Sequence, residues 1–224
     1  MGTYRVIFDL DDTLYAERDF AHSGFRAVDN WANAKWGVTG LCQDMCDLLD
    51  AGYLGALFKI ALAKHRPDFS DVELTEMQKV YDTHTPNIRL FEDARFALGH
   101  FAAKGPIGLI TDGNAEMQKA KIESLGIAGQ FARIIFTHEG GGRAYSKPHP
   151  WSYKLMEAEL AEPETQFVYV GDNPAKDFVT PNAQGWISIQ VQRARPIHDP
   201  YKIVEGGAPQ HIVQTLDELT EILV

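Results

Sequence analysis

The sequence has little cysteine. Its only two cysteines, Cys42 and Cys46, are four residues apart, a spacing that suits one face of a helix better than a disulfide framework. Two thiols at this spacing could in principle share a soft metal ion, but no second Cys/His pair at zinc-binding spacing accompanies them. We therefore interpret both as ordinary helix residues in a protein of a reducing compartment.

Long apolar segments are also missing. No stretch approaches the ~20 consecutive apolar residues that a membrane-spanning helix needs. The N-terminus passes from Met1 almost directly into a short apolar run, without the basic and apolar regions of a secretory signal. These features predict a cytoplasmic protein with no membrane partner.

Basic residues are scarce relative to acidic ones. The 224 residues include 21 Lys and Arg against 31 Asp and Glu, for a formal net charge of -10. The long-range field therefore repels nucleic acid and anionic membranes, and an anionic substrate must be bound by a local group of cations. A hydrophobic content of 45% is ordinary for a globular chain. The length allows one sizeable core, or a core with a small accessory domain.

The periodicity of apolar residues divides the chain into two regions. Residues 4–9 form a short run rich in β-formers, and helical periodicity without a strand signal follows from about 17 to 84. In this block Ser70 and Glu73 form a possible capping box. After Asn87, helices alternate with short apolar runs, a pattern typical of a parallel sheet with helices on both faces.

The expected elements assign the chain to the α/β class, as a doubly wound, mainly parallel, Rossmann-like sheet with a small all-helical domain. Residues 1–15 and 88–224 should form the α/β core, and residues 16–87 the helical domain. A helix in this domain is expected from Leu54 through Leu62. In the core we expect helices at 91–104, 114–125, 151–160, 175–183 and the C-terminus, and strands at 4–9, 107–110, 133–137, 166–170, 186–191 and 211–213.

Polar motifs stand where three of these strands end. DLDDT begins at Asp9, TDGN begins at Thr111, and GDNP begins at Gly171 with Asp177 beyond it. Lys147 precedes the helix at 151–160. Ligands of doubly wound sheets bind at the carboxyl ends of the strands, so we expect these motifs to line one crevice.

The acidic residues of these motifs predict a metal site. Clustered carboxylates repel each other unless a cation joins them, and Mg²⁺ with oxygen ligands is the expected ion. The ion would offset the charge of a phosphate, to which Thr111, Lys147 and backbone N–H groups at a helix start would donate hydrogen bonds.

Four motifs in this order, FDLDDTL, LITDGN, SKPHP and VGDNPAKD, resemble those of the haloacid dehalogenase superfamily of hydrolases. The resemblance spans nearly the whole chain and implies that the helical insertion is a cap over the core. It also implies that Asp9 is the nucleophile and Asp11 the general acid and base. Thr111 and Lys147 would bind the phosphoryl group with Asp112 and Gly113, where Asp112 contributes its backbone rather than its carboxylate.

The same resemblance implies the ligands of the metal ion. Asp9, the backbone carbonyl of Asp11 and Asp172 would hold Mg²⁺, and Asp177 would lie just outside them, as a direct or water-mediated partner. The chemistry of the residues agrees with these roles. A carboxylate can be phosphorylated, which divides one hard displacement into two easier ones, and a nearby second carboxylate can protonate the leaving oxygen and then activate water.

Three residues near the motifs have simpler interpretations. Asp12 is interpreted as a turn residue, although many relatives have Gly there. His149 stands where many relatives carry Asp and is interpreted as a helix-start residue. Arg143 follows three glycines; it could contact substrate, but we interpret it as part of a surface loop.

These features predict a Mg²⁺-dependent phosphohydrolase that cleaves small phosphomonoesters of metabolites through an aspartyl-phosphate. Asp11 argues against a dehalogenase, whereas a phosphomutase of the same superfamily stays open. A receiver-type phospho-accepting domain is disfavoured because its acceptor Asp follows the acidic pair on an interior strand. A non-catalytic binding protein would have no reason to retain all four motifs. Substrate identity and oligomeric state stay open.

Overall fold

The computed structural model describes residues 3–223. Clustering of contacts divides these residues into two compact units. The first unit extends to Glu17 and resumes at Arg89, and the second is Arg18–Ile88.

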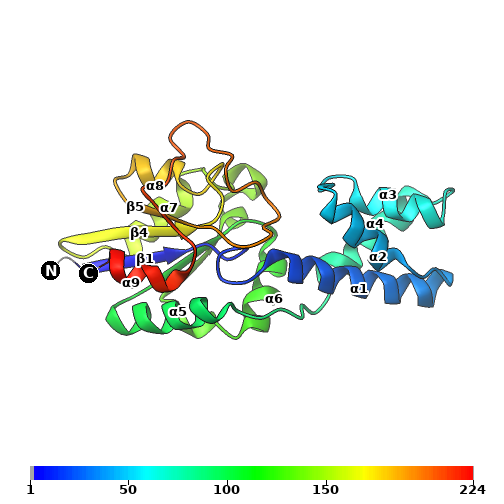
Figure 1. Ribbon diagram of the computed structural model, residues 1–224, viewed down its shortest axis with the longest axis horizontal. Helices are drawn as coiled ribbons and strands as arrows, with labels where there is room; N and C mark the ends of the chain where they lie inside the picture. The colour runs from blue at the N-terminus through cyan, green and yellow to red at the C-terminus, as the bar shows by residue number, and fades with distance from the viewer. Residues whose placement is uncertain (1–2, 224) are drawn as a thin grey trace. The chain divides into compact units, whose positions relative to one another are not determined.

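The first unit is built on a six-stranded sheet with the order β3-β2-β1-β4-β5-β6, in which every neighbouring pair is parallel (Figure 1). β1 lies between β2 and β4, so that Phe8 at its carboxyl end is in register with Leu109 and Val170. The ends of these three strands therefore meet at one edge. The strands are β1 (Thr3–Phe8), β2 (Gly108–Thr111), β3 (Arg133–Phe136), β4 (Thr165–Gly171), β5 (Ile187–Val191) and β6 (His211–Val213).

Helices cover both faces of this sheet. α5 (Glu92–Lys104), α6 (Ala115–Leu125) and α9 (Leu219–Ile222) lie on one side in Figure 1, and α7 (Trp151–Leu160) and α8 (Val179–Ala183) on the other. Four short 3-10 helices complete the unit: η1 (Ala128–Gln130), η2 (Thr137–Gly140), η3 (Gly142–Tyr145) and η4 (Leu216–Glu218). The doubly wound α/β fold class is confirmed.

A layer of apolar side chains joins the sheet to α7 and α8. Ile7, Ile110 and Ile135 come from three neighbouring strands, and Tyr153 and Met156 come from α7. All are at most 2% exposed. Burying this much apolar surface is the main favourable contribution to folding. It also fixes the strand ends where the polar motifs begin.

α8 begins later than the sequence predicts, at Val179 rather than near residue 175. The Asn173 side chain accepts the N–H of Ala175 at 3.0 Å, and the Asn173 carbonyl accepts the N–H of Asp177 at 2.9 Å. Asn173 thus caps a single turn that does not continue directly into α8. The segment after Gly171 is therefore a turn that brings Asp177 back toward the end of β4.

The second unit contains only helices among its regular elements: α1 (Glu17–Trp36), which begins at the boundary, α2 (Leu41–Asp50), α3 (Leu57–His65) and α4 (Asp71–Thr83). The expected capping box is present, since Ser70 and Glu73 accept each other's backbone N–H groups at the start of α4. The expected start of a helix at Leu54 is wrong. Leu54 is 51% exposed and follows Gly52, whose φ of 85° interrupts helical geometry.

Among the described residues, no helix combines the length and apolar character that crossing a membrane requires.

Candidate active site

Asp9 follows the last residue of β1 directly, and its backbone N–H donates to the carbonyl of Val170 at 2.8 Å. The chain then turns sharply. Asp12 has a φ of 49°, a left-handed conformation that Asp tolerates better than most residues. Its two carboxylate oxygens accept the backbone N–H groups of Glu17 at 2.8 Å and Ile197 at 2.9 Å. Asp12 therefore has the turn role that the sequence indicated.

Lys147 lies between two of the predicted site carboxylates. Its Nζ atom is 2.7 Å from Oδ1 of Asp9 and 2.7 Å from Oδ1 of Asp177. It also donates to the hydroxyl of Tyr169 at 3.1 Å. Burial lowers the pKa of Lys147, but the charges of Asp177 and Asp9 outweigh burial and raise it well above its ordinary value. The ammonium ion is therefore retained in a fully buried position.

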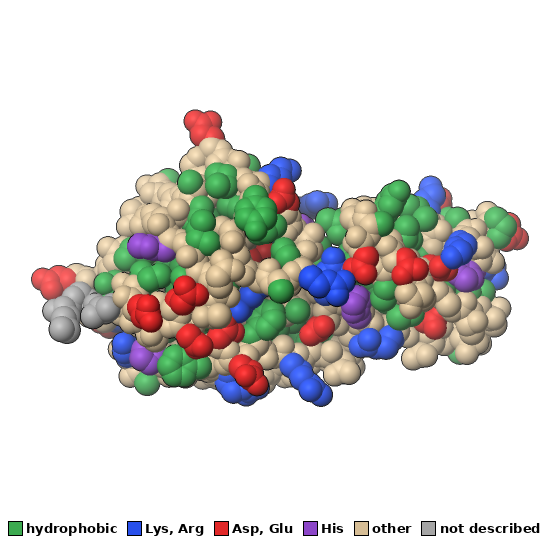
Figure 2. Space-filling view, viewed as in Figure 1, with side chains coloured by type: hydrophobic (Ala, Val, Ile, Leu, Met, Phe, Trp, Pro, Cys, Tyr) green, Lys and Arg blue, Asp and Glu red, His purple; other side chains and the backbone are tan. Residues whose placement is uncertain are grey.

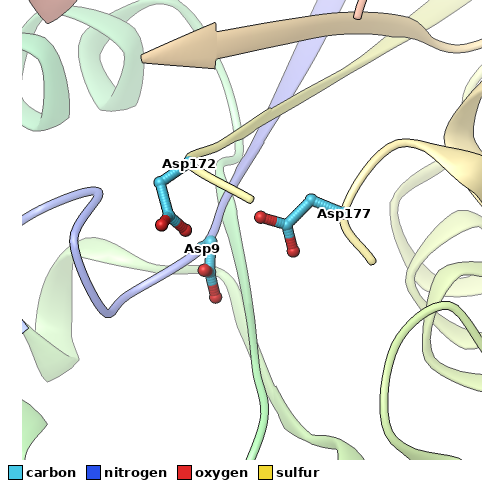
Figure 3. Close-up of side chains that lie close together, drawn as sticks. All are labelled: Asp9, Asp172 and Asp177. Atoms are coloured by element: carbon cyan, nitrogen blue, oxygen red, sulfur yellow. The ribbon is translucent and has the colours of Figure 1, made fainter. Parts of the chain in front are cut away.

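Asp9, Asp172 and Asp177 form a compact acidic group (Figure 3). Each contributes a carboxylate oxygen, and these oxygens lie within 4.8 Å of one another. Burial raises the pKa of Asp9 to about 6 against the opposing charge of Lys147. Burial and the charges of Asp177 and Asp9 raise the pKa of Asp172 well above its ordinary value.

This acidic group fits a hard divalent cation. Among the described residues, Oδ2 of Asp9 has no hydrogen-bond partner although it is buried. A buried carboxylate oxygen without a partner is unfavourable, and a cation bound to it would remove that cost. Oxygen ligands in this number suit Mg²⁺. The donor set therefore matches the ion that the sequence predicts.

The carboxylate of Asp11 contacts two side chains of α6. Lys121 Nζ lies 2.7 Å from its Oδ1, and Gln118 Nε2 donates to its Oδ2 at 2.9 Å. The hydroxyl of Tyr15 donates a short hydrogen bond to Oδ1. Burial raises the pKa of Asp11, but Lys121 and these donors outweigh it and hold the pKa below its ordinary value.

Three of the four predicted phosphate-binding residues, Thr111, Asp112 and Gly113, lie at the end of β2. Thr111 is buried and its hydroxyl accepts a hydrogen bond from Gln118. Gly113 has a φ of 120°, which favours glycine at this turn. Oδ1 of Asp112 accepts the backbone N–H of Lys147 at 3.0 Å and the hydroxyl of Thr137 at 2.8 Å. The Asp112 carboxylate thus has a structural role that the sequence did not reveal, because it anchors the backbone of Lys147.

A cavity of about 250 Å³ opens over these residues, within the first unit. Arg143 lines it, although the sequence favoured a surface-loop role for this residue. Glu17 and His198, which lie outside the four motifs, line it too. Lys176 also lines it; this residue is part of VGDNPAKD, but the motif predicted no role for it. The lining residues are Asp11, Glu17, Asp112, Gly113, His138, Arg143, Ser146, Asp172, Lys176 and His198.

A comparison with protein-family models decides the family. The model of haloacid dehalogenase-like hydrolases matches residues 5–180, which is most of the chain. The chain belongs to the haloacid dehalogenase-like hydrolases. A second model, of HAD-hydrolase-like proteins, matches residues 144–219 of the hydrolase. The resemblance found in the four sequence motifs is confirmed.

Curated relatives of this hydrolase include phosphatases. It is 28% identical over 233 residues to the glyceraldehyde 3-phosphate phosphatase of Methanocaldococcus jannaschii, with 97% of this chain and 96% of the relative covered. It is 28% identical over 186 residues to the phosphoglycolate phosphatase of Yersinia pseudotuberculosis, with 80% and 77% covered.

Solved structures of the same family share the fold. The HAD-hydrolase YfnB of Bacillus subtilis, solved with bound magnesium, superimposes with a TM-score of 0.69 at 15% identity, and 98% of each chain is covered. A HAD phosphatase of Thermococcus onnurineus gives a TM-score of 0.63 at 19% identity, with 98% of this chain and 97% of the other covered.

Proposed function

We propose that this hydrolase cleaves small phosphomonoesters in a Mg²⁺-dependent reaction through an aspartyl-phosphate on Asp9. One observation carries the proposal. Asp9 has one carboxylate oxygen paired with Lys147 at 2.7 Å, while the other, among the described residues, has no hydrogen-bond partner and belongs to the acidic group with Asp172 and Asp177. One oxygen paired with a lysine and the other facing a cation site is the arrangement expected of a carboxylate nucleophile beside a metal ion. The phosphatase names of the curated relatives support a phosphoryl substrate.

The metal would be held by Asp9, the backbone carbonyl of Asp11 and Asp172, with Asp177 close by. When bound, Mg²⁺ supplies positive charge that offsets the negative charge of the phosphoryl oxygens. The partnerless oxygen of Asp9 and the raised pKa of Asp172 support this assignment. Magnesium bound to a protein of the same fold also supports it.

In the first step, a carboxylate oxygen of Asp9 attacks phosphorus, and the bond from phosphorus to the ester oxygen breaks. The bonding electrons leave with that oxygen, which takes a proton from Asp11. Thr111 and Lys147 hold the phosphoryl oxygens with a backbone N–H near Gly113. In the second step, Asp11 accepts a proton from water as the water oxygen attacks phosphorus. The bond to Asp9 then breaks and inorganic phosphate leaves.

The size of the site favours small substrates. The cavity of about 250 Å³ lies just below the usual range of ligand sites, ~300 to 1,000 Å³. Its lining combines the cations Arg143 and Lys176 with four acidic residues and with polar side chains, which suits a short phosphorylated metabolite with further polar groups. The two relatives named for glyceraldehyde 3-phosphate and phosphoglycolate agree with this class.

Phosphate release tests the proposal. Purified protein is incubated with para-nitrophenyl phosphate, glyceraldehyde 3-phosphate and phosphoglycolate, with Mg²⁺ or with EDTA, and inorganic phosphate is measured. We expect turnover with Mg²⁺ only. Asp9→Asn should reduce it by at least ~10⁴-fold, because an amide cannot attack phosphorus as a carboxylate does.

Asp68→Asn is the matched control, since Asp68 is an exposed carboxylate of the second unit, and it should leave turnover unchanged. Substantial turnover by Asp9→Asn would contradict the role of Asp9. Turnover that survives EDTA would contradict the role of the metal. No phosphate release from any of these esters or from a wider panel of small phosphomonoesters would contradict the proposed function.

A further inference from the structure

Two side chains on one face of α6, Gln118 and Lys121, lie outside the four family motifs. We propose that they position the carboxylate of Asp11 for proton transfer, Lys121 through an ion pair and Gln118 through a hydrogen bond that also reaches Thr111. The inference rests on the proposed function of Asp11. In this proposal the reacting groups follow the ends of strands, and α6 supplies the residues that position one of them.

Lys121 and Gln118 contact different oxygens of the Asp11 carboxylate. Lys121 Nζ lies 2.7 Å from Oδ1, and Gln118 Nε2 lies 2.9 Å from Oδ2. Each oxygen therefore has its own donor from α6. Rotation of the carboxylate would break at least one contact, so the pair holds it in one orientation.

Gln118 links two proposed site residues. Its Nε2 donates to the hydroxyl of Thr111 as well as to Asp11. An amide nitrogen has two hydrogens to donate, so both bonds can exist together. The residue proposed to protonate the leaving oxygen is thereby held at a fixed position relative to a residue proposed to bind the phosphoryl group.

α6 is built to present these two side chains together. Asn114 caps its start by accepting the backbone N–H of Glu116 at 2.9 Å, and residues three apart on a helix lie on the same face. The side chain of Lys121 is 4% exposed, whereas that of Lys119 on the same helix is 45% exposed. A buried ammonium is costly unless it is paired, so the burial of Lys121 points to its partner Asp11.

Positioning has a kinetic signature that a purely structural ion pair lacks. General acid catalysis matters most for a poor leaving group such as an alkoxide, and least for para-nitrophenolate. A shift of about 1 Å in a catalytic group can cost ~10²-fold in rate. Loss of the α6 contacts should therefore slow an alkyl phosphate more than the aryl ester. It should also slow the second step, in which Asp11 activates water.

The test compares Lys121→Met with wild type on para-nitrophenyl phosphate and on an alkyl phosphomonoester that the wild type hydrolyses. We expect kcat for the alkyl ester to fall by roughly 10- to 100-fold, with KM changed less than about threefold. Acid quench during turnover of the aryl ester should trap more phosphoprotein in the variant than in wild type. Lys121→Arg should restore part of the rate, and Lys119→Met is the control on the same helix.

A double variant shows whether Lys121 acts through Asp11. If it does, Lys121→Met should cause little further loss in an Asp11→Asn background, because residues that act as a unit are not additive. Full additivity would overturn the inference. Equal slowing of both esters without trapped phosphoprotein would overturn it as well. Gln118→Met, of similar volume, supplies the same readouts should Lys121→Met fail to fold.

Failure of the inference is distinguishable from failure of the proposed function. If wild type is active and Asp11→Asn discriminates between the two esters while Lys121→Met and Gln118→Met do not, only the positioning role is wrong. If Asp11→Asn itself slows both esters equally, Asp11 does not transfer the proton, and both the role of Asp11 and the inference that depends on it are wrong.

Discussion

Asp9 and Asp11 are two residues apart at the end of β1, and their surroundings shift their pKa values in opposite directions. Burial raises the pKa of Asp9 to about 6 against the charge of Lys147. For Asp11, Lys121 and three hydrogen bonds outweigh burial and lower the pKa. Carboxylates with opposed environments have different tasks in many hydrolases. The charged form of Asp11 is the form that activates water in the proposed second step.

Asp172 should determine the metal requirement. Asp172→Ala removes a charged oxygen from the acidic group with Asp9 and Asp177, and a hard cation binds more weakly when it loses such a ligand. We expect the Mg²⁺ concentration for half-maximal activity to rise at least tenfold, the lower range of ~10- to 100-fold seen for residues around metal sites. Titration of phosphate release with Mg²⁺ measures this shift. An unchanged midpoint would remove Asp172 from the metal site.

Glu17 makes the stability of the fold depend on pH. Burial and the charge of Asp11 raise its pKa from 4.5 to about 8, against the charge of Lys121. Between these values the unfolded chain has lost the proton that the folded chain keeps, so stability falls as pH rises through this window. Glu17→Gln replaces the titrating carboxyl with an amide and should remove this pH dependence.

We therefore expect Glu17→Gln to stabilise the protein more at pH 8 than at pH 5 relative to wild type. The difference between the two pH values should be at least ~1 kcal/mol, because one pKa unit corresponds to ~1.4 kcal/mol. Urea unfolding of both proteins at the two pH values measures it. An equal effect at both would contradict the raised pKa.

The end of β4 packs so closely against the turn that follows it that Gly171 has no room for a side chain. A Cβ atom there would lie 2.6 Å from Oδ2 and 2.9 Å from Cγ of Asp177. Asp177 is held in turn by Lys147 and by the N–H of Asn173. Gly171→Ala must therefore displace part of the acidic group.

We expect Gly171→Ala to reduce kcat by at least ~10-fold, since small displacements of site residues are costly, and to raise the Mg²⁺ requirement. Gly129→Ala is the matched control, because no heavy atom lies within 4 Å of a Cβ added there. Phosphate release and circular dichroism of both variants separate a local effect from unfolding. Full activity of Gly171→Ala would show that catalysis does not depend on the position of the Asp177 carboxylate.

Much of the fold could be predicted from the sequence, because apolar periodicity and turn residues act locally. The bounds of α7, 151–160, agree with the sequence prediction. The separate turn that Asn173 caps before α8 is a detail that periodicity does not register. Lys121 contacts Asp11 across 110 positions of the chain, so no local pattern reveals that contact. Their three-residue spacing places Gln118 and Lys121 on one face of a helix, but it does not name their partner.

Part of the acidic excess of the chain lies on one exposed surface of the first unit. Figure 2 shows acidic side chains gathered over α5 and α9, where Glu92, Asp93 and Glu221 line a groove with other acidic residues. The cavity of the site contains Lys176 and Arg143 beside the acidic residues Asp11, Glu17, Asp112 and Asp172. An anionic substrate therefore depends on cations placed within the site, as the net charge of -10 led us to expect.

Tyr15 and Leu90 form an isolated antiparallel bridge, and the N–H of Phe91 donates to the carbonyl of Leu14 at 3.0 Å. Both contacts belong to the first unit, and they hold together the two chain segments that lead to residues 18–88 and back. These backbone contacts hold the two ends of the helical insertion close together within the first unit, independently of residues 18–88. Insertions are tolerated where their two ends lie close together.

We expect a chain in which a short glycine-rich linker replaces residues 18–88 to keep the six-stranded sheet, as measured by circular dichroism and cooperative urea unfolding. A grafted helical unit from a relative should be accepted at the same two points. Loss of cooperative unfolding on excision would show that the two units depend on each other for folding. A preserved fold would show that the first unit folds on its own, with residues 18–88 as an insertion that its strands do not need.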